Sequence, residues 1–121
     1  MKNILITLAI LFANSFTAKG QNKVKEDSIA VKGNCIMCKR RIETAMDLNG
    51  IKFSEWNVKT KKLFIAYRPD KISEKEIHKA LANAGHDTNL VKAADTTYAD
   101  LPFCCLYRDH DPHGPNGEEL H

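Results

Sequence analysis

The chain of 121 residues has few aromatic side chains, and no set of catalytic residues stands out in it. Phe, Trp and Tyr together make up 7% of the sequence and are not interleaved with its scattered Lys and Arg residues. This pattern argues against nucleic-acid binding, which uses a basic surface interleaved with aromatic side chains. No nucleophile is paired with a general base and no two carboxylates are placed for acid–base chemistry, so we expect a protein that is not an enzyme.

A long apolar run occurs only at the N-terminus. Ile4 to Phe12 is almost unbroken, follows the basic residue Lys2, and precedes Ala18-Lys19-Gly20, which offers small residues at both recognition positions of a cleavage site. These features are typical of a secretory signal peptide over residues 1–20, too short for a membrane anchor. We therefore expect export of residues 21–121 to the bacterial periplasm, the alternative being an uncleaved N-terminal anchor.

Charge divides the exported part into two unlike regions. Residues 21–92 carry 15 Lys or Arg against 9 Asp or Glu, whereas residues 93–121 carry only Arg108 against six Asp or Glu. A basic body followed by an acidic tail suggests that the tail docks on the body, or that the body has an acidic partner.

The first half of the body reads as strand, helix, strand, strand. A short strand at 29–31 ends at a Gly-Asn turn, and side chains from 38 to 49 repeat at helical spacing up to Gly50, which we expect to cap the helix. A strand at 51–58 changes its alternation, so we expect a bulge near 54–55. Alternating apolar residues predict another strand at 63–67.

The second half adds a helix and a weaker strand. The helix begins at a capping box formed by Ser73 and Glu76 and ends at Gly85, with His78 on its polar, solvated side. A fourth strand is expected at about 88–92. The order indicates an α+β, ferredoxin-like βαββαβ sandwich with two helices on one face of a four-stranded antiparallel sheet. The expected core residues include Ile42, Trp56, Ile65 and Leu81.

Cys35 and Cys38 lie at the junction of the first strand and the first helix, and Lys39, Arg40 and Arg41 follow at once. This spacing lets both sulfur atoms face one point beyond the helix N-terminus, where the helix dipole and the three cations favour thiolate over thiol. Such a pair either binds a soft metal ion or exchanges a disulfide. A local structural disulfide is the third interpretation.

The order of elements, the Cys35–Cys38 pair and Gly85-His86-Asp87 after the second helix resemble the heavy-metal-associated domain family. The resemblance covers about residues 27–93 and predicts such a domain over 21–93. The family includes copper chaperones, domains of copper-pumping ATPases and the periplasmic mercury-binding protein. It implies that Cys35 and Cys38 hold one soft ion, commonly Cu(I), and pass it to a partner by ligand exchange.

Two positions depart from the usual pattern of this family. The family usually has Gly-Met-Thr before the first cysteine, its Met being a buried prop under the loop, whereas this chain has Lys32-Gly33-Asn34. Met37 lies between the cysteines instead, where packing or exposure is favoured over ligation. The family often has Tyr or Phe after the glycine that closes the second helix. Here that residue is His86, a candidate third ligand.

The tail at 94–121 contains a second pair of cysteines, Cys104 and Cys105. Neighbouring cysteines rarely bond to each other, so these are surface thiols, partners of a disulfide to the body, or further metal ligands. His110, His113 and His121 can add to such a site. Four thiolates would suit Zn(II) or a Cu(I) cluster. We expect 98–107 to dock on the body and 109–121 to be flexible. The candidate metal ligands are Cys35, Cys38, His86, Cys104 and Cys105.

Together these features predict an exported soft-metal-binding protein, with Cu(I) favoured over Hg(II) and Zn(II). The expected partner is a metal-transporting membrane protein that docks near Lys39, Arg40 and Arg41, and the expected state is a monomer or a metal-bridged dimer. A thiol–disulfide redox protein is the first alternative, although the Trp-Cys-Gly-Pro motif of thioredoxin is absent. A passive metal buffer is the second.

Overall fold

The computed structural model describes residues 23–110, so the predicted signal peptide, His113, His121 and most of the predicted flexible end lie outside the described residues. The elements are β1 (Lys25–Ala30), α2 (Ile36–Ala45), β2 (Ile51–Asn57), β3 (Lys62–Tyr67), α3 (Glu74–Asn83), α4 (Asp95–Ala99) and the 3-10 helix η1 (Phe103–Cys105). Within residues 23–110, no helix is both long and apolar enough to cross a membrane.

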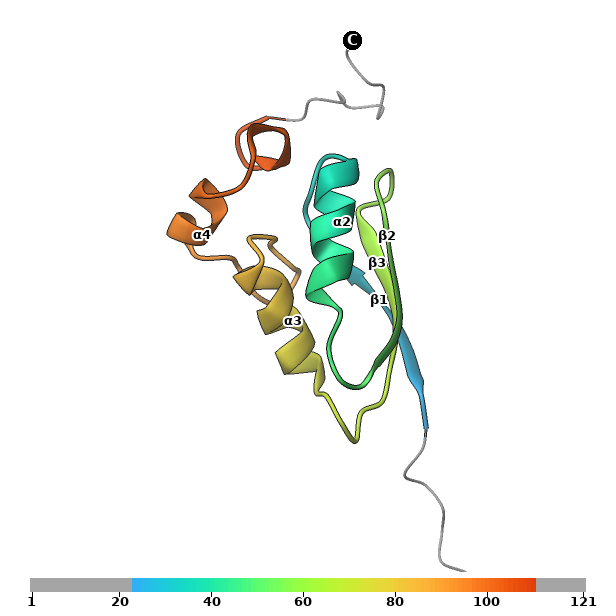
Figure 1. Ribbon diagram of the computed structural model, residues 1–121. Helices are drawn as coiled ribbons and strands as arrows, with labels where there is room; N and C mark the ends of the chain where they lie inside the picture. Colours follow the sequence, from blue (N-terminus) through green and yellow to red (C-terminus); the bar gives the residue numbers. More distant parts are fainter. Residues whose placement is uncertain (1–22, 111–121) are drawn as a thin grey trace, which may run out of the picture.

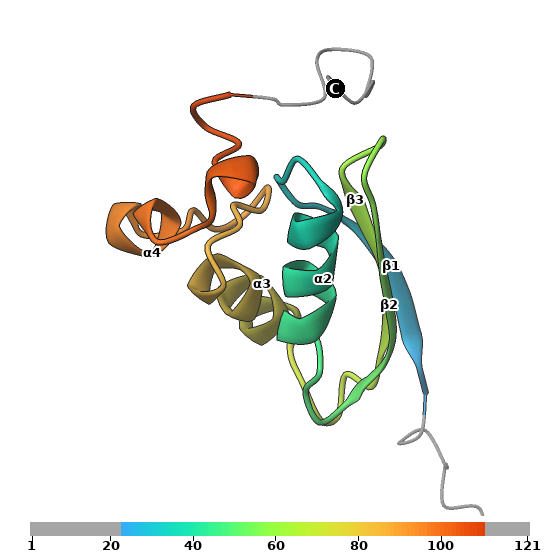
Figure 2. The ribbon, with the colours of Figure 1, turned by 45° about the horizontal axis from the view of Figure 1, so that its top comes forward.

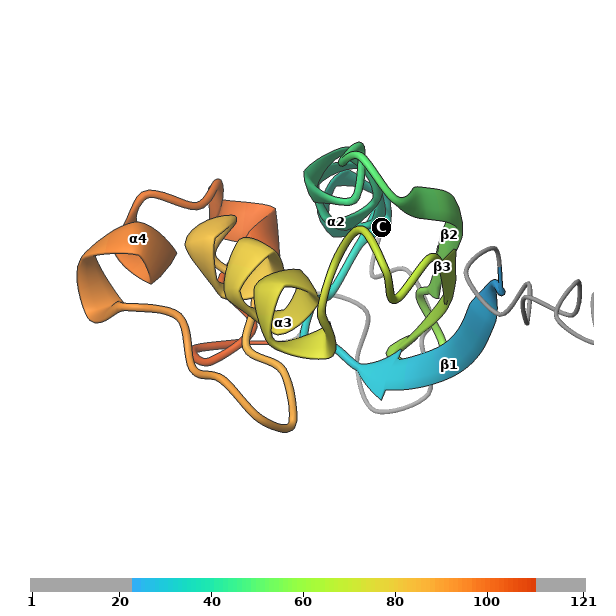
Figure 3. The ribbon, with the colours of Figure 1, turned by 90° about the horizontal axis from the view of Figure 1, so that it is seen from below.

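The three strands form one antiparallel sheet in the order β1-β3-β2 (Figure 1). Figure 3 shows that α2 and α3 lie on the same face of this sheet. The C-terminal segment continues beyond α3, and η1 packs beside the N-terminal end of α2 (Figure 2). The α+β class is therefore as predicted.

The predicted fourth strand at 88–92 does not form within residues 23–110, so the sheet there has three strands and not four. A single isolated bridge, between Val31 and Thr88, links this segment to the end of β1. Thr88 closes a turn instead, because its Oγ1 accepts hydrogen bonds from the amides of Leu90 and Val91 at 3.2 and 3.0 Å. This local hydrogen bonding competes with the strand ladder, which is limited here to the one bridge.

The irregularity in β2 lies nearer its start than predicted. The register with β3 shifts between Ile51 and Phe53, not near 54–55. Phe53 is therefore half exposed and packs against Phe64 at a ring-centroid distance of 5.9 Å, while Trp56 is buried. An extra residue in one strand reverses which side chains face the core, and here it turns Trp56 toward the helices.

The ends of the first helix also differ from the prediction. α2 begins at Ile36 because Cys35 is its N-cap residue, and it ends at Ala45 with Met46 as the C-cap. Gly50 has a positive φ of 99° but lies in the turn before β2 and does not cap the helix. The start of α3 is confirmed, since Ser73 Oγ accepts a hydrogen bond from the Glu76 amide at 3.1 Å.

Gly85 ends α3 as predicted, with a φ of 101°. Its amide donates to the Ala82 carbonyl at 2.9 Å, and the His86 amide donates to the Leu81 carbonyl at 3.1 Å, which is the Schellman pattern. Leu101 packs directly on this turn, because a Cβ at Gly85 would lie 2.8 Å from Leu101 Cδ2. The turn thereby joins α3 to the C-terminal segment.

We expect Gly85→Ala to lower the free energy of unfolding by about 1–2 kcal/mol, because a side chain disfavours a positive φ. The close contact with Leu101 adds to this cost. Urea denaturation of the two proteins would measure the difference, and equal stabilities would contradict the assignment of the turn as a glycine-dependent cap.

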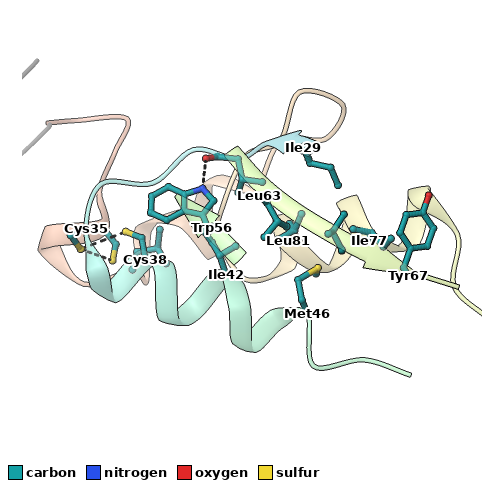
Figure 4. Close-up of a cluster of buried hydrophobic side chains, with 14 of the residues drawn as sticks. Ile29, Cys35, Cys38, Ile42, Met46, Trp56, Leu63, Tyr67, Ile77 and Leu81 are labelled. Carbon is teal, nitrogen blue, oxygen red and sulfur yellow. Dashed lines mark hydrogen bonds between the residues drawn. The ribbon is translucent and has the colours of Figure 1, made fainter. Parts of the chain in front are cut away.

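The hydrophobic core lies between the sheet and the two helices. Ile42, Trp56, Ile65 and Leu81 are fully buried, which confirms their predicted place (Figure 4). His78, predicted to be solvated, is buried as well, and its Nδ1 lies 2.6 Å from Thr88 Oγ1. The turn that replaces the fourth strand provides this hydrogen-bond partner, so the helical pattern alone could not reveal it.

Candidate metal centre

Cys35 and Cys38 lie at the start of α2, Cys35 as the N-cap residue and Cys38 within the first turn. Their Sγ atoms are 3.7 Å apart, and the residues are only 6% and 0% exposed. Figure 4 shows both at one end of the core, beside Trp56. The structure thus brings the two sulfur atoms to one point at the helix N-terminus.

A third sulfur atom reaches this point from the C-terminal segment. η1 packs against α2 and buries Cys105, whose Sγ lies 3.8 Å from Cys35 Sγ. The Sγ atoms of Cys35, Cys38 and Cys105 all lie within 4.8 Å of one another. All four cysteines are free thiols, and Cys104 is less buried than the other three.

The spacing of the three sulfur atoms suits one soft ion. Metal–sulfur bonds of about 2.3 Å place the ligands of a trigonal ion about 4 Å apart. The observed distances from Cys35 Sγ to the other two sulfur atoms are 3.7 and 3.8 Å. Two thiolates on opposite sides of a linear ion would be about 4.6 Å apart, farther than Cys35 and Cys38 are. The arrangement therefore favours three ligands over the pair alone.

The surroundings of Cys35 favour its thiolate. Burial opposes its ionisation, but the backbone amide of Cys38 and the side chains of Cys104 and Cys38 hold the pKa of Cys35 below its ordinary value. The amide is one of the unpaired N–H groups at the start of α2, which favour a negative charge.

Cys105 has the opposite tendency. Burial raises the pKa of Cys105, and its contacts with Cys38 and Cys35, both in hydrogen bonds and in charge, raise it further. The surroundings thus favour the thiolate at Cys35 and the thiol at Cys105, so binding of a metal ion by Cys105 requires loss of its proton. Arg41 Nη1 lies 3.3 Å from Cys105 Sγ and is positioned to pair with the thiolate that then forms.

We expect the ultraviolet absorbance of thiolate in the reduced protein to begin to rise at a lower pH than that of an ordinary cysteine, and this early transition to be missing in Cys35→Ser. Because the folded-state pKa is lowered, ionised Cys35 stabilises the fold above the unfolded pKa, and this contribution disappears as the pH falls through the folded value. The stability of the wild type relative to Cys35→Ser should therefore rise with pH. A first transition that survives in Cys35→Ser would contradict the assignment.

Arg108 ties the segment that carries Cys105 to the rest of the domain. Its Nη2 and Nε donate to the two carboxylate oxygens of Asp87 at 2.7 and 3.1 Å, and Nη2 also donates to the Ala93 carbonyl at 2.8 Å. Burial opposes ionisation of Asp87, but Arg108 holds the pKa of that carboxyl below its usual range. The neighbouring Tyr107 hydroxyl donates to the Gly85 carbonyl at 2.7 Å. Cys105 is thus held in place without a disulfide.

Sequence reasoning did not predict the pairing of Arg108 with Asp87 or the contact between Arg41 and Cys105. A signal for the first was present, because Arg108 is the one basic Lys or Arg residue in an otherwise acidic tail. The sequence could not show which acidic residue of the body pairs with Arg108, because the turn that ends α3 is what places Asp87 beside it.

Trp56 supports the loop that precedes Cys35. Its Nε1 donates to the Val31 carbonyl at 3.0 Å, and a Cβ at Gly33 would lie 3.1 Å from two of its ring carbons and 3.0 Å from Cys38 Cβ. The Asn34 amide donates to Cys38 Sγ at 3.3 Å. The indole therefore fills the space beneath this loop, which lacks the buried methionine that usually precedes the first cysteine in the family that the sequence resembles. Gly33 has no side chain and so allows the indole to approach.

The predicted histidine ligands lie apart from the three sulfur atoms. His86 is fully buried, its Nδ1 lies 2.8 Å from the Lys32 carbonyl, and its ring stacks on Tyr107. Burial lowers the pKa of His86, so its imidazole is neutral at pH 7. His110 stacks on Phe103 at a centroid distance of 4.3 Å. Neither histidine belongs to the group of ligand atoms that lie within 4.8 Å of one another.

The three cations after Cys38 differ in their contacts. Lys39 pairs with Glu43 and donates to the Trp56 carbonyl at 3.1 Å, and Arg41 contacts Cys105. Arg40 is exposed. Arg40 and Arg41 border a surface depression of about 550 Å³, together with Met37, Thr44, Ala45 and Ala84. The basic part of this surface therefore lies on one side of α2, next to the sulfur atoms.

Comparison with known proteins identifies the fold. No family model matches the chain, and no curated protein is significantly similar to it. The "CopZ metallochaperone" structure is similar over 53% of this chain and 98% of its own length, with a TM-score of 0.51 and 21% identity. Oxidized MerP from Ralstonia metallidurans CH34 is similar over 55% of this chain and 96% of its own, with a TM-score of 0.53 and 20% identity.

A third similar structure is the N-terminal domain of a potential copper-translocating P-type ATPase from Bacillus subtilis in the Cu(I)-loaded state. It covers 60% of this chain and 94% of its own, with a TM-score of 0.53 and 20% identity. The three structures are similar in fold to this chain, which confirms the predicted α+β class but not the predicted four-stranded layout.

Proposed function

We propose that this protein, which has the fold of the heavy-metal-associated domains, binds one soft metal ion through Cys35, Cys38 and Cys105 and passes it to a partner. The observation that carries the proposal is the group of three buried sulfur atoms at the N-terminus of α2. Buried thiols at this spacing can bind a soft ion and release it to another thiolate, so the proposed role is binding and transfer rather than catalysis.

Cu(I) is the favoured ion, because thiolates are soft ligands. Three thiolates also suit an ion with three ligands better than one that needs four in a tetrahedron. Hg(II) is the next candidate on the same grounds. Zn(II) is less favoured, since its structural sites take four ligands. A domain of a potential copper-translocating ATPase in the Cu(I)-loaded state is among the similar structures. The ion would be transferred by ligand exchange, in which a thiolate of the partner binds it before the ligands of this chain leave.

The proposed partner is a metal-transporting membrane protein that docks beside the site, where Arg40 is exposed. Its docking surface would be acidic and would cover the depression along α2. We further propose that the protein acts outside the cytoplasm after removal of residues 1–20, as a monomer or a metal-bridged dimer.

A redox function is the second candidate. The sulfur atom of Cys35 is 3.7 Å from that of Cys38 and 3.8 Å from that of Cys105, so a small movement would allow a disulfide with either residue. The lowered pKa of Cys35 would make it the attacking thiolate. Passive metal buffering requires the same ligands but no docking surface.

The test is an anaerobic Cu(I) titration of reduced protein lacking residues 1–20 against a competing chelator, repeated with Cys105→Ser. We expect one tightly held ion in the wild type and about a 10–100-fold weaker affinity in the variant, at least the effect of losing an outer-shell partner. An unchanged affinity would exclude Cys105 as a ligand. Failure of the wild type to compete with the chelator would overturn the proposal and favour the redox function.

A further inference from the structure

Sulfur atoms continue outward from the three buried ones to the surface. Cys104 Sγ lies 3.9 Å from Cys105 Sγ and 3.4 Å from the Sδ of Met37. Met37 is 44% exposed and Cys104 is partly exposed, whereas Cys35, Cys38 and Cys105 are buried. A second group of soft ligands therefore lies at the surface, next to the first.

This outer pair joins two separate parts of the chain. Met37 comes from the first turn of α2 and Cys104 from η1, and their sulfur atoms meet although both side chains remain in contact with water. In the metal-free protein the Cys104 thiol donates a weak hydrogen bond to the Met37 thioether, and this contact already brings the two sulfur atoms together. A thioether and a thiolate are both ligands that Cu(I) accepts.

The distances suit an ion that shares a ligand with the inner one. Two sulfur ligands of one trigonal ion lie about 4 Å apart when the metal–sulfur bonds are about 2.3 Å. Cys104 and Cys105 are separated by 3.9 Å, which matches this spacing. Cys104 and Met37 are closer, at 3.4 Å, so the partly exposed Met37 side chain would move slightly outward to bind the ion. Cys105 is within reach of both groups, since its Sγ is also 3.8 Å from Cys35 Sγ.

We propose that Met37 and Cys104 form an outer position for a second Cu(I) ion, linked to the inner ion by the bridging thiolate of Cys105. This inference rests on the proposed function and deepens it. Binding of the second ion adds one positive charge and releases one proton from Cys104, so the net charge of the cluster does not change. Arg41 pairs with the bridging Cys105, and its positive charge offsets part of the negative charge of the thiolates.

The outer ion should be bound more weakly than the inner one. Both ions share the thiolate of Cys105. The other two ligands of the inner ion are thiolates, whereas the outer ion has one thiolate and one neutral thioether. Because Met37 is 44% exposed and Cys104 is partly exposed, the ligands of a partner can reach the outer ion without opening the core. The outer position is therefore the one from which transfer would begin.

Native mass spectrometry of protein lacking residues 1–20, titrated anaerobically with Cu(I), tests this inference. We expect the wild-type monomer to take up one ion and then a second, whereas Cys104→Ser and Met37→Leu stop at one. Ile36→Leu is the matched control, because Ile36 is the preceding exposed residue and has no sulfur. It should bind two ions like the wild type.

A wild-type monomer that stops at one ion would overturn the outer position and leave the proposed function intact. Two ions in Cys104→Ser would place the second ion elsewhere, and two ions in Met37→Leu would exclude the thioether as a ligand. Loss of the second ion in Ile36→Leu would also overturn the assignment, since that change removes no ligand. Absence of any bound ion in the wild type would overturn both proposals.

Discussion

Replacing Cys35 by serine is expected to weaken Cu(I) binding by more than about 100-fold, beyond the effect of losing an outer-shell partner. Cys35 is central among the three buried sulfur atoms, at 3.7 Å from Cys38 and 3.8 Å from Cys105. Its surroundings also lower its pKa, which favours the thiolate that binds the ion. Competition with a chelator under anaerobic conditions measures the loss.

Serine is a suitable replacement because it is among the best N-cap residues, and Cys35 is the N-cap of α2. The helix should therefore begin at the same residue, and the far-ultraviolet circular dichroism should be unchanged. A variant that keeps its fold and loses the ion would assign the effect to the sulfur atom. Wild-type affinity in Cys35→Ser would contradict the proposed function.

Replacing Trp56 by alanine is expected to lower the free energy of unfolding by about 3–5 kcal/mol, the usual cost of removing a large buried aromatic side chain. Trp56 is 1% exposed and its indole donates to the Val31 carbonyl at 3.0 Å. It also lies against Gly33 in the loop before Cys35. The loss of stability should therefore be accompanied by a weaker metal affinity.

Phe53→Ala is the matched control, since Phe53 is on the same strand but 50% exposed. We expect it to cost less than about 1 kcal/mol, because surface substitutions have small effects. Urea denaturation with Cu(I) absent gives the stabilities, and the chelator titration gives the affinities. Similar losses in the two variants would contradict the view that Trp56 is the support of the metal loop.

Much of the fold follows from patterns that act over a few residues. The Ser73 cap, the glycine turn after α3 and the strand at 63–67 were predicted close to where they lie, because caps and alternation depend on neighbouring residues. The same locality explains the pair of cysteines, since residues three positions apart at the start of a helix face the same side.

The errors lie where the alternation of apolar residues competes with side-chain hydrogen bonds or with pairing between strands. The weak alternation of the segment at 88–92 suggested a strand. Instead, the Thr88 side chain closes a turn and also contacts His78. The bulge in β2 was predicted near 54–55 but lies between Ile51 and Phe53. A bulge at either position restores the alternation of side chains, and only the pairing with β3 decides between the two positions.

The sequence by itself determined a small α+β domain with two thiols at a helix N-terminus and a sulfur-bearing tail. Only the tertiary structure decided which of those tail residues meets the pair, because Cys105 is 70 positions from Cys35 and no periodicity connects them. The Arg108–Asp87 ion pair and the packing of Leu101 on Gly85 place η1 against α2. Those long-range contacts bring Cys105 beside Cys35 and Cys38, and thereby turn a two-thiol motif into a group of three.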